Sequence, residues 1–239
     1  MSGHSKWSTI KRKKGAADAE RGKIFAKLAK EIYVAAKNGD ADPANNAALR
    51  MVIEKAKAEN MPKTNIQNAI DKASKSGAGD NFEQVRYEGY GPSGMAIMID
   101  CLTDNRNRTA GFVRSTLTKR GGNLGTDGSV AYMFKKKGIL LLDKSYDEEK
   151  LMNDVLELNI EDFVSNDDSY EITTSPNDFL SVKEGLVELG YDKYIMSEVT
   201  FIPDNYMSLD EETKEKALAL IEALEDIDDV QSVYHNLEI

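Results

Sequence analysis

The period of the apolar residues changes near residue 80, and this change limits the fold more than any other feature of the chain. Before it, apolar residues recur every three or four positions, as at Ile24, Leu28 and Ile32, which predicts amphipathic helices. The stretch SKSGAGD then ends the helical pattern, and the segment QVRYEGYGPSGMAIMIDCL predicts two strands joined by a turn. A chain of 239 residues is long for one core, so we expect two or three compact units.

The first unit is predicted to be a small bundle of three helices. One helix runs from about residue 18 to 38 and stops at Gly39, a second runs from the turn DADP to about Glu59, and a third ends at the Gly/Ser stretch.

The later part predicts a helix over NRNRTAGFVRSTLTKR, a strand over SVAYMF and a second run of elements over 138–203. That run has the order β-α-β-β-α-β, which is typical of a ferredoxin-like unit. A helix over 209–225 and a last strand, VQSVYHN, complete the chain.

These elements predict an α+β multidomain fold with three parts. Residues 1–80 form a basic arm and a helical bundle. Residues 81–135 plus 206–239 form a discontinuous α+β sandwich domain, and residues 136–205 form an inserted, acidic, ferredoxin-like α+β domain.

Charge is unevenly distributed along the chain, although the net charge is only −10. Residues 1–80 hold 16 Lys and Arg against 9 Asp and Glu, whereas residues 141–239 hold 6 against 27. A basic front and an acidic rear say more about partners than about fold. The front can approach a polyanion, and the rear will be repelled by it.

No segment of the sequence predicts insertion in a membrane or export. No run reaches the roughly 18–20 apolar residues that span a bilayer, and no signal-peptide apolar run is found near the start. The single cysteine, Cys101, excludes an intramolecular disulfide and is expected to be buried in a strand. We expect a cytoplasmic protein.

Residues for catalysis are scarce. The two histidines, His4 and His235, have no Cys, His or carboxylate at metal-ligand spacing, and no G-x-S-x-G sequence is found. The segment GGNLGTDGS lacks the Gly-Lys-Ser/Thr end of a phosphate-binding loop, so it indicates a helix cap and turn, or backbone near phosphates. We expect no enzymatic activity, no metal, no cofactor and no small-molecule substrate.

The densest basic segment is SKWSTIKRKKG at residues 5–15. Its cations could neutralise several phosphates, and its tryptophan could stack on a base. The alternatives are a solubilising tail and a tryptophan docked in the protein's own core. The candidate nucleic-acid-binding residues of this arm are Lys6, Trp7, Lys11, Arg12, Lys13 and Lys14.

Three other groups of cations are candidates for the same role. Lys23, Lys27 and Lys30 share the polar side of the first helix, where ordinary solvated surface is the alternative. Arg106 and Arg108 begin a helix, and the helix dipole disfavours cations at that end. The two arginines are therefore expected to bind an anion there, and the alternative is that they pair with carboxylates of the acidic domains. Lys119 and Arg120 lie beside the glycine-rich segment.

Several separated motifs together resemble the YebC/PmpR family. They are GHSKWSTIKRKKGAADAERGKIFAKLAKEI, YEGYGPSGMAIMI, TDNRNRT and GGNLGTDGSVAYMF, and the resemblance covers essentially the whole chain. Its members are described as probable transcriptional regulators, and a relative is the mitochondrial translational activator of cytochrome oxidase subunit one. The resemblance implies three domains with a discontinuous middle one, and nucleic-acid binding without enzymatic activity.

Two functions remain open from the sequence. The first is a DNA-binding transcriptional regulator that contacts promoter DNA, and the second is a ribosome-associated, RNA-binding translation factor that relieves stalled elongation. No helix-turn-helix can be assigned, and the acidic rear would limit wrapping of a duplex. Both functions use the same basic residues.

Overall fold

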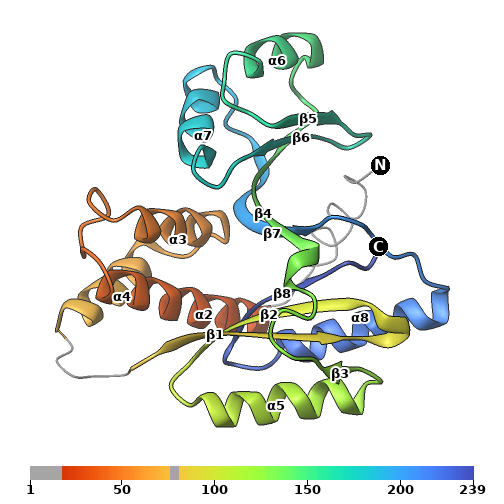
Figure 1. Ribbon diagram of the computed structural model, residues 1–239. Helices are drawn as coiled ribbons and strands as arrows, with labels where there is room; N and C mark the ends of the chain where they lie inside the picture. The colour runs from red at the N-terminus through yellow and green to blue at the C-terminus, as the bar shows by residue number, and fades with distance from the viewer. Residues whose placement is uncertain (1–17, 76–80) are drawn as a thin grey trace.

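The computed structural model describes residues 18–75 and 81–239. The helical unit consists of α2 (Asp18–Lys37), α3 (Ala47–Ala58) and α4 (Lys63–Lys75) (Figure 1). Asn46 caps α3 by accepting a hydrogen bond from the backbone N–H of Leu49. Apolar side chains of the three helices form one core, which includes Ile32, Leu49 and Ile70. The predicted helical bundle is therefore present.

The second unit is built on an antiparallel sheet with strand order β3-β1-β2-β8. Its strands are β1 (Glu83–Tyr90), β2 (Ala96–Thr103), β3 (Asn123–Leu124) and β8 (Val230–His235), and the short 3-10 helix η1 (Pro92–Gly94) joins β1 to β2. One face of the sheet, with Ile97 and Ile99, is covered by α5 (Arg106–Lys119) and α8 (Glu211–Glu225). The unit is discontinuous because α8 and β8 return to it from the end of the chain.

The third unit lies between these two parts of the chain and has the strand order β5-β6-β4-β7. Its strands are β4 (Phe134–Asp143), β5 (Asp162–Ser165), β6 (Ser169–Thr174) and β7 (Tyr194–Pro203), and its helices are α6 (Glu148–Val155) and α7 (Phe179–Glu188). Both helices pack on one face, around Leu140, Leu142 and Ile172. This order and connectivity define a ferredoxin-like α+β unit, as the sequence predicted.

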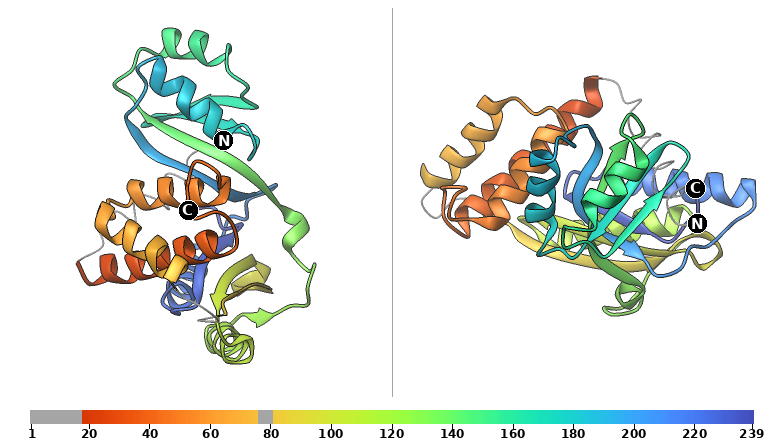
Figure 2. Two further views of the ribbon diagram at one scale, coloured as in Figure 1. Left: turned by 90° about the vertical axis from the view of Figure 1, so that its left-hand side faces the viewer. Right: turned by 90° about the horizontal axis from the view of Figure 1, so that it is seen from above.

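The two long strands β4 and β7 pair with each other from end to end and connect the two α+β units. At their base, Phe134 and Phe201 pack with Ala96 and Met98 on the second face of the first sheet. Figures 1 and 2 show that α6 and α5 lie at opposite ends of the molecule. The inserted unit therefore keeps its acidic surface far from α5.

The predicted strand SVAYMF is wrong. Residues 131–133 form the 3-10 helix η2 (Ala131–Met133), and the third position in the sheet is taken by the two-residue strand β3. The buried carboxylate of Glu88 explains the difference, because it accepts hydrogen bonds from the backbone N–H groups of Gly128, Val130 and Ala131, each at 2.7 Å. Backbone donors that are bound to a side chain cannot also form a strand ladder.

Within the described residues, no helix is long and apolar enough to cross a bilayer. Cys101 is buried in β2, as predicted, and burial raises the pKa of its thiol to about 12. The thiol is therefore protonated and unreactive at neutral pH.

Candidate nucleic-acid interface

The lysines of α2 face an acidic turn from the other end of the chain. Lys23 pairs with Asp226 at 2.9 Å, Lys27 donates to the backbone carbonyl of Glu225, and Lys30 lies 3.4 Å from the carboxylate of Asp229. We call residues 225–229, from the last residue of α8 to the residue before β8, the acidic turn. In the sequence, the acids near these lysines are Glu20 and Glu31, whereas the carboxylates that meet them in the fold come from about 200 positions away.

Asp229 is the centre of this contact, and its side chain is 8% exposed. One of its carboxylate oxygens accepts from Arg108 at 2.7 Å, from Thr109 at 2.8 Å and from Thr103 at 3.3 Å. The other oxygen faces Lys30. The carboxylate therefore ties the helical unit to the start of α5.

The pKa of Asp229 shows which effect dominates at this position. Burial alone would raise the pKa of the carboxyl group, but hydrogen bonds from Arg108 and Thr109, and the charges of Lys30 and Arg108, outweigh burial and lower the pKa. The group is ionised at neutral pH and serves as an internal anion at the start of α5. For Arg108, the structure favours pairing with carboxylates, because Asp104 also lies 2.8 Å from the guanidinium group.

α5 is held firmly by its own sequence. Asn105 caps the helix by accepting from the backbone N–H of Arg108, and Thr109, Val113 and Leu117 are buried on the sheet side. The hydroxyl of Tyr87 on β1 donates to the backbone carbonyl of Arg106. These contacts fix which side of α5 faces outward.

α5 and its C-cap residue form a basic segment that contains no acid. Residues 106–120 hold five Lys or Arg and no Asp or Glu. Four of these cations are exposed and have no carboxylate partner among residues 18–75 and 81–239, namely Arg106, Arg114, Lys119 and Arg120. Arg114 and Lys119 lie on the outward side of the helix, whereas Arg106 and Arg120 lie at its two ends. Clustered uncompensated cations are the electrostatic feature that polyanion-binding surfaces share.

The neighbouring helix on the same sheet face has the opposite charge. α8 holds five Glu and two Lys over residues 211–225. It packs against α5 through apolar residues such as Leu220 and Leu224. A polyanion that contacts this face is therefore attracted to α5 and repelled by α8. It is expected to approach the face from the side of α5.

Several backbone donors of the glycine-rich segment after α5 are bound within the fold. Glu88 binds three N–H groups of the 128–131 stretch, and its backbone carbonyl accepts from the N–H of Gly125. Burial alone would raise the pKa of Glu88, but the three hydrogen bonds lower it. These bonds favour a helix cap and turn over backbone donors near phosphates as the interpretation of the segment.

Part of the predicted interface cannot be placed. Lys6, Trp7, Lys11, Arg12, Lys13 and Lys14 lie outside the described residues. The sequence did not single out Arg114, Asn107 and Phe112, whose helical spacing from the buried Val113 and Leu117 places them on the outward side of α5.

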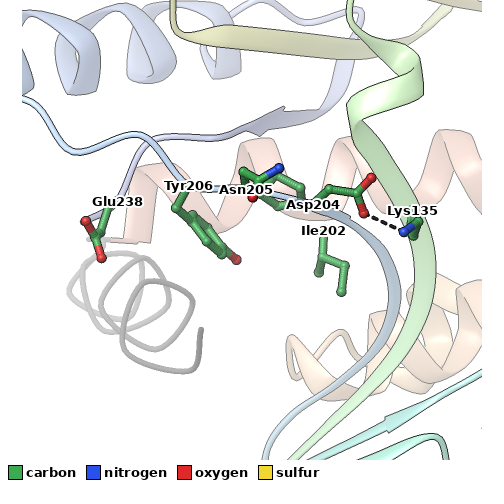
Figure 3. Close-up of a pocket in the computed structure, with 7 residues that line it drawn as sticks. Lys135, Ile202, Asp204, Asn205, Tyr206 and Glu238 are labelled. Atoms are coloured by element: carbon green, nitrogen blue, oxygen red, sulfur yellow. Dashed lines mark ion pairs between the residues drawn. The ribbon is translucent and has the colours of Figure 1, made fainter. Parts of the chain in front are cut away.

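A hollow of about 450 Å³ lies at the base of the inserted unit, between the ends of β4 and β7 and the chain terminus (Figure 3). Lys135 and Asp204 form an ion pair at 2.8 Å on its wall, and Tyr206 points into the same region. Burial raises the pKa of Tyr206 to about 12, so its phenol is protonated at neutral pH. None of the described lining residues is a histidine or cysteine, and the described chain holds no cluster of three potential metal ligands.

The fold and this surface define a class: a multidomain α+β protein with a basic helix at one end and an acidic domain at the other. Family models describe the same chain in two parts. The model of the TACO1/YebC protein N-terminal domain matches residues 5–76, and that of the TACO1/YebC second and third domain matches residues 82–237. The chain belongs to the TACO1/YebC family.

Individual relatives agree with this assignment over their full length. The chain is 52% identical to a probable transcriptional regulatory protein of Geobacillus kaustophilus, with 100% of this chain and 98% of the relative covered. It is also 52% identical to the probable transcriptional regulatory protein YrbC of Bacillus subtilis, with 99% of both covered. The crystal structure of a conserved hypothetical protein from Aquifex aeolicus matches with a TM-score of 0.82 at 43% identity, covering 94% of this chain and 93% of that one.

Proposed function

We propose that this protein is a non-enzymatic regulator of transcription that binds duplex DNA through the outward side of α5, assisted by the basic arm at residues 5–15. The family and the names of its relatives support the regulatory role. The observation that carries the DNA-binding part is the set of four exposed cations on α5 and its C-cap that have no carboxylate partner among the described residues.

The charge distribution supports the same assignment. Phosphate contacts supply most of the affinity of nucleic-acid-binding proteins, and they need cations that are not already paired. α5 offers such cations at the end of the molecule opposite the inserted acidic unit (Figures 1 and 2). The lysines of α2 are bound to the acidic turn, so we expect them to contribute less to DNA affinity than the sequence predicted.

The test is a titration of the full chain against labelled duplex DNA and against a structured RNA, each at several salt concentrations. We expect duplex binding that weakens steeply with salt, with a log–log slope near −0.9 for each phosphate neutralised. Affinity for RNA far above that for DNA would instead favour the translation factor. No binding to either would contradict the proposal.

The arm is tested by removing residues 1–15. We expect duplex affinity to fall more than tenfold, because five cations are lost from the total charge facing the DNA. Unchanged affinity would mean that the arm does not contact nucleic acid.

A further inference from the structure

α5 presents two outward rows of side chains along its length. At 3.6 residues per turn, one row is Asn107, Gly111, Arg114 and Thr118, and the adjacent row is Arg108, Phe112, Ser115 and Lys119. All but Ser115 are exposed, and the side of the helix with Val113 and Leu117 is buried against the sheet. The outward side is therefore exposed along the helix, although Arg108 at its start is bound to Asp104 and Asp229.

The composition of these rows matches what a helix needs in the major groove of DNA. Arg pairs with the O6 and N7 atoms of guanine, and Asn with the N6 and N7 atoms of adenine. Asn107 and Arg114 share one row two turns apart, so both can face base edges at once. Phe112, which is 53% exposed, offers apolar contact of the kind that thymine methyl groups receive.

Gly111 lies at the middle of the outward row, and a Cβ atom added to it would meet nothing within 4 Å. Inside an exposed helix, glycine lowers stability more than any residue except proline. No neighbour in the described chain requires a glycine at position 111. The missing side chain lets the helix backbone approach a partner closely.

Cations surround this row at both ends of α5. Arg106 lies at the start of the helix, and Lys119 and Arg120 lie at its end. None of these three cations has a carboxylate partner in the described part of the chain. A helix with its side chains is roughly as wide as the B-form major groove, so cations at its ends and flank reach the phosphates that border the groove.

From these observations, and resting on the proposed function, we infer that α5 is a recognition helix that enters the major groove of B-form DNA and reads its sequence. Arg114 and Asn107 contact base edges, while Lys119 and Arg120 contact phosphates. The major groove of an A-form RNA duplex is too deep and narrow for a helix to enter, so the partner is DNA.

The first experiment selects binders from a pool of random-sequence duplexes with the full chain, and repeats the selection with Arg114→Ala and Lys119→Ala. We expect the wild type to enrich a motif that contains a guanine at one position. Arg114→Ala loses the preference at that position and binds the selected duplex about 10- to 100-fold more weakly. Lys119→Ala keeps the motif and weakens selected and unselected duplexes equally.

The second experiment compares Gly111→Gln with a matched control, Gly22→Gln. Gly22 also lies exposed inside a helix, with nothing within 4 Å of an added Cβ atom. Both changes keep or raise the melting temperature, because glutamine favours a helix more than glycine does. We expect Gly111→Gln to weaken duplex binding at least tenfold and Gly22→Gln to leave it unchanged.

The third measurement uses duplexes in which glucosylated hydroxymethylcytosine fills the major groove, with netropsin as the competitor for the minor groove. We expect the filled major groove to block binding and netropsin to have little effect. The inference is overturned if netropsin alone competes, if the Arg114 and Gly111 variants bind as the wild type does, or if an RNA hairpin competes better than duplex. If the wild type binds no duplex at any salt concentration, the proposed function fails as well.

Discussion

α2 and α5 carry similar cations, but their surroundings differ. Lys23, Lys27 and Lys30 contact the acidic turn, and the nearest carboxylate of that turn is 2.9 Å away. Arg114 and Lys119 on α5 face outward with no carboxylate partner in the described residues. A row of cations on a helix therefore says little about binding until the charges that the rest of the fold brings against it are known.

The difference also explains how an acidic chain can present the polyanion-binding surface that we propose. The acidic turn neutralises one basic face and thereby holds the helical unit against the middle sheet through Asp229. The second basic face stays uncompensated. One set of cations serves the packing of the domains, and the other is available to a partner.

The largest expected effect is a loss of duplex affinity, and it distinguishes the α5 cations from the α2 cations when each set is removed in turn. Replacing Arg114, Lys119 and Arg120 by Ala is expected to weaken duplex binding about 100-fold near 0.1 M salt, because one base-edge contact and roughly two phosphate contacts are lost. The melting temperature is expected to stay the same. Replacing Lys23, Lys27 and Lys30 by Ala is expected to change affinity less than about threefold.

The second triple variant is instead expected to lower the free energy of unfolding by about 1–2 kcal/mol, since it removes charge-assisted hydrogen bonds to the acidic turn. Binding isotherms and denaturant unfolding on both variants measure the contrast. If the α2 variant loses binding and the α5 variant does not, the comparison is reversed.

A smaller effect is expected for Asp229→Ala. The change leaves Arg108, Thr109 and Lys30 without their shared acceptor, so the free energy of unfolding should fall by about 2 kcal/mol. The matched control is Asp226→Ala, which removes an exposed pair with Lys23 and should cost less than about 0.5 kcal/mol. Equal effects of the two changes in urea unfolding would show that the buried carboxylate has no special role.

The smallest expected effect is a change in the pH dependence of stability. The pKa of Asp229 is lowered in the folded state, so the folded protein binds this proton less readily than the unfolded chain. The carboxylate therefore stabilises the protein above the ordinary aspartate pKa, near 4, and this contribution is lost as the pH falls through the lower folded pKa.

Unfolding of the wild type and of Asp229→Asn between about pH 6 and pH 3 tests this contribution. The pKa of Glu88 is also lowered, and its contribution is common to both proteins. The advantage of the wild type should shrink toward acid pH. A constant difference across the range would show that the charge of Asp229 does not stabilise the fold.

Much of the fold could be predicted from local patterns. The three N-terminal helices, the hairpin of β1 and β2, and the β-α-β-β-α-β order of the inserted unit follow from hydrophobic period and turn residues. SVAYMF failed because its pattern resembles a strand, while its backbone donors bind a carboxylate 40 or more positions earlier in the chain. A side chain so distant in sequence has no local signal.

The candidate site was predicted less well, for the same physical reason. Charge and spacing identified the lysines of α2 and the arginines that begin α5, but not the acidic turn that pairs with Lys30 and Arg108. Arg114 was overlooked because a single cation among Ser and Thr has no density in the sequence. It becomes visible only when the buried Val113 and Leu117 define the outward side of the helix.

The most direct test of the account is to measure how fast each lysine of the wild-type protein is acetylated, with and without duplex DNA, by mass spectrometry. We predict that DNA strongly protects Lys119, whereas Lys27 and Lys30 react slowly in both conditions because they are already bound to the acidic turn. If DNA protects the α2 lysines and leaves Lys119 as reactive as before, the interface lies on α2 and the account is contradicted.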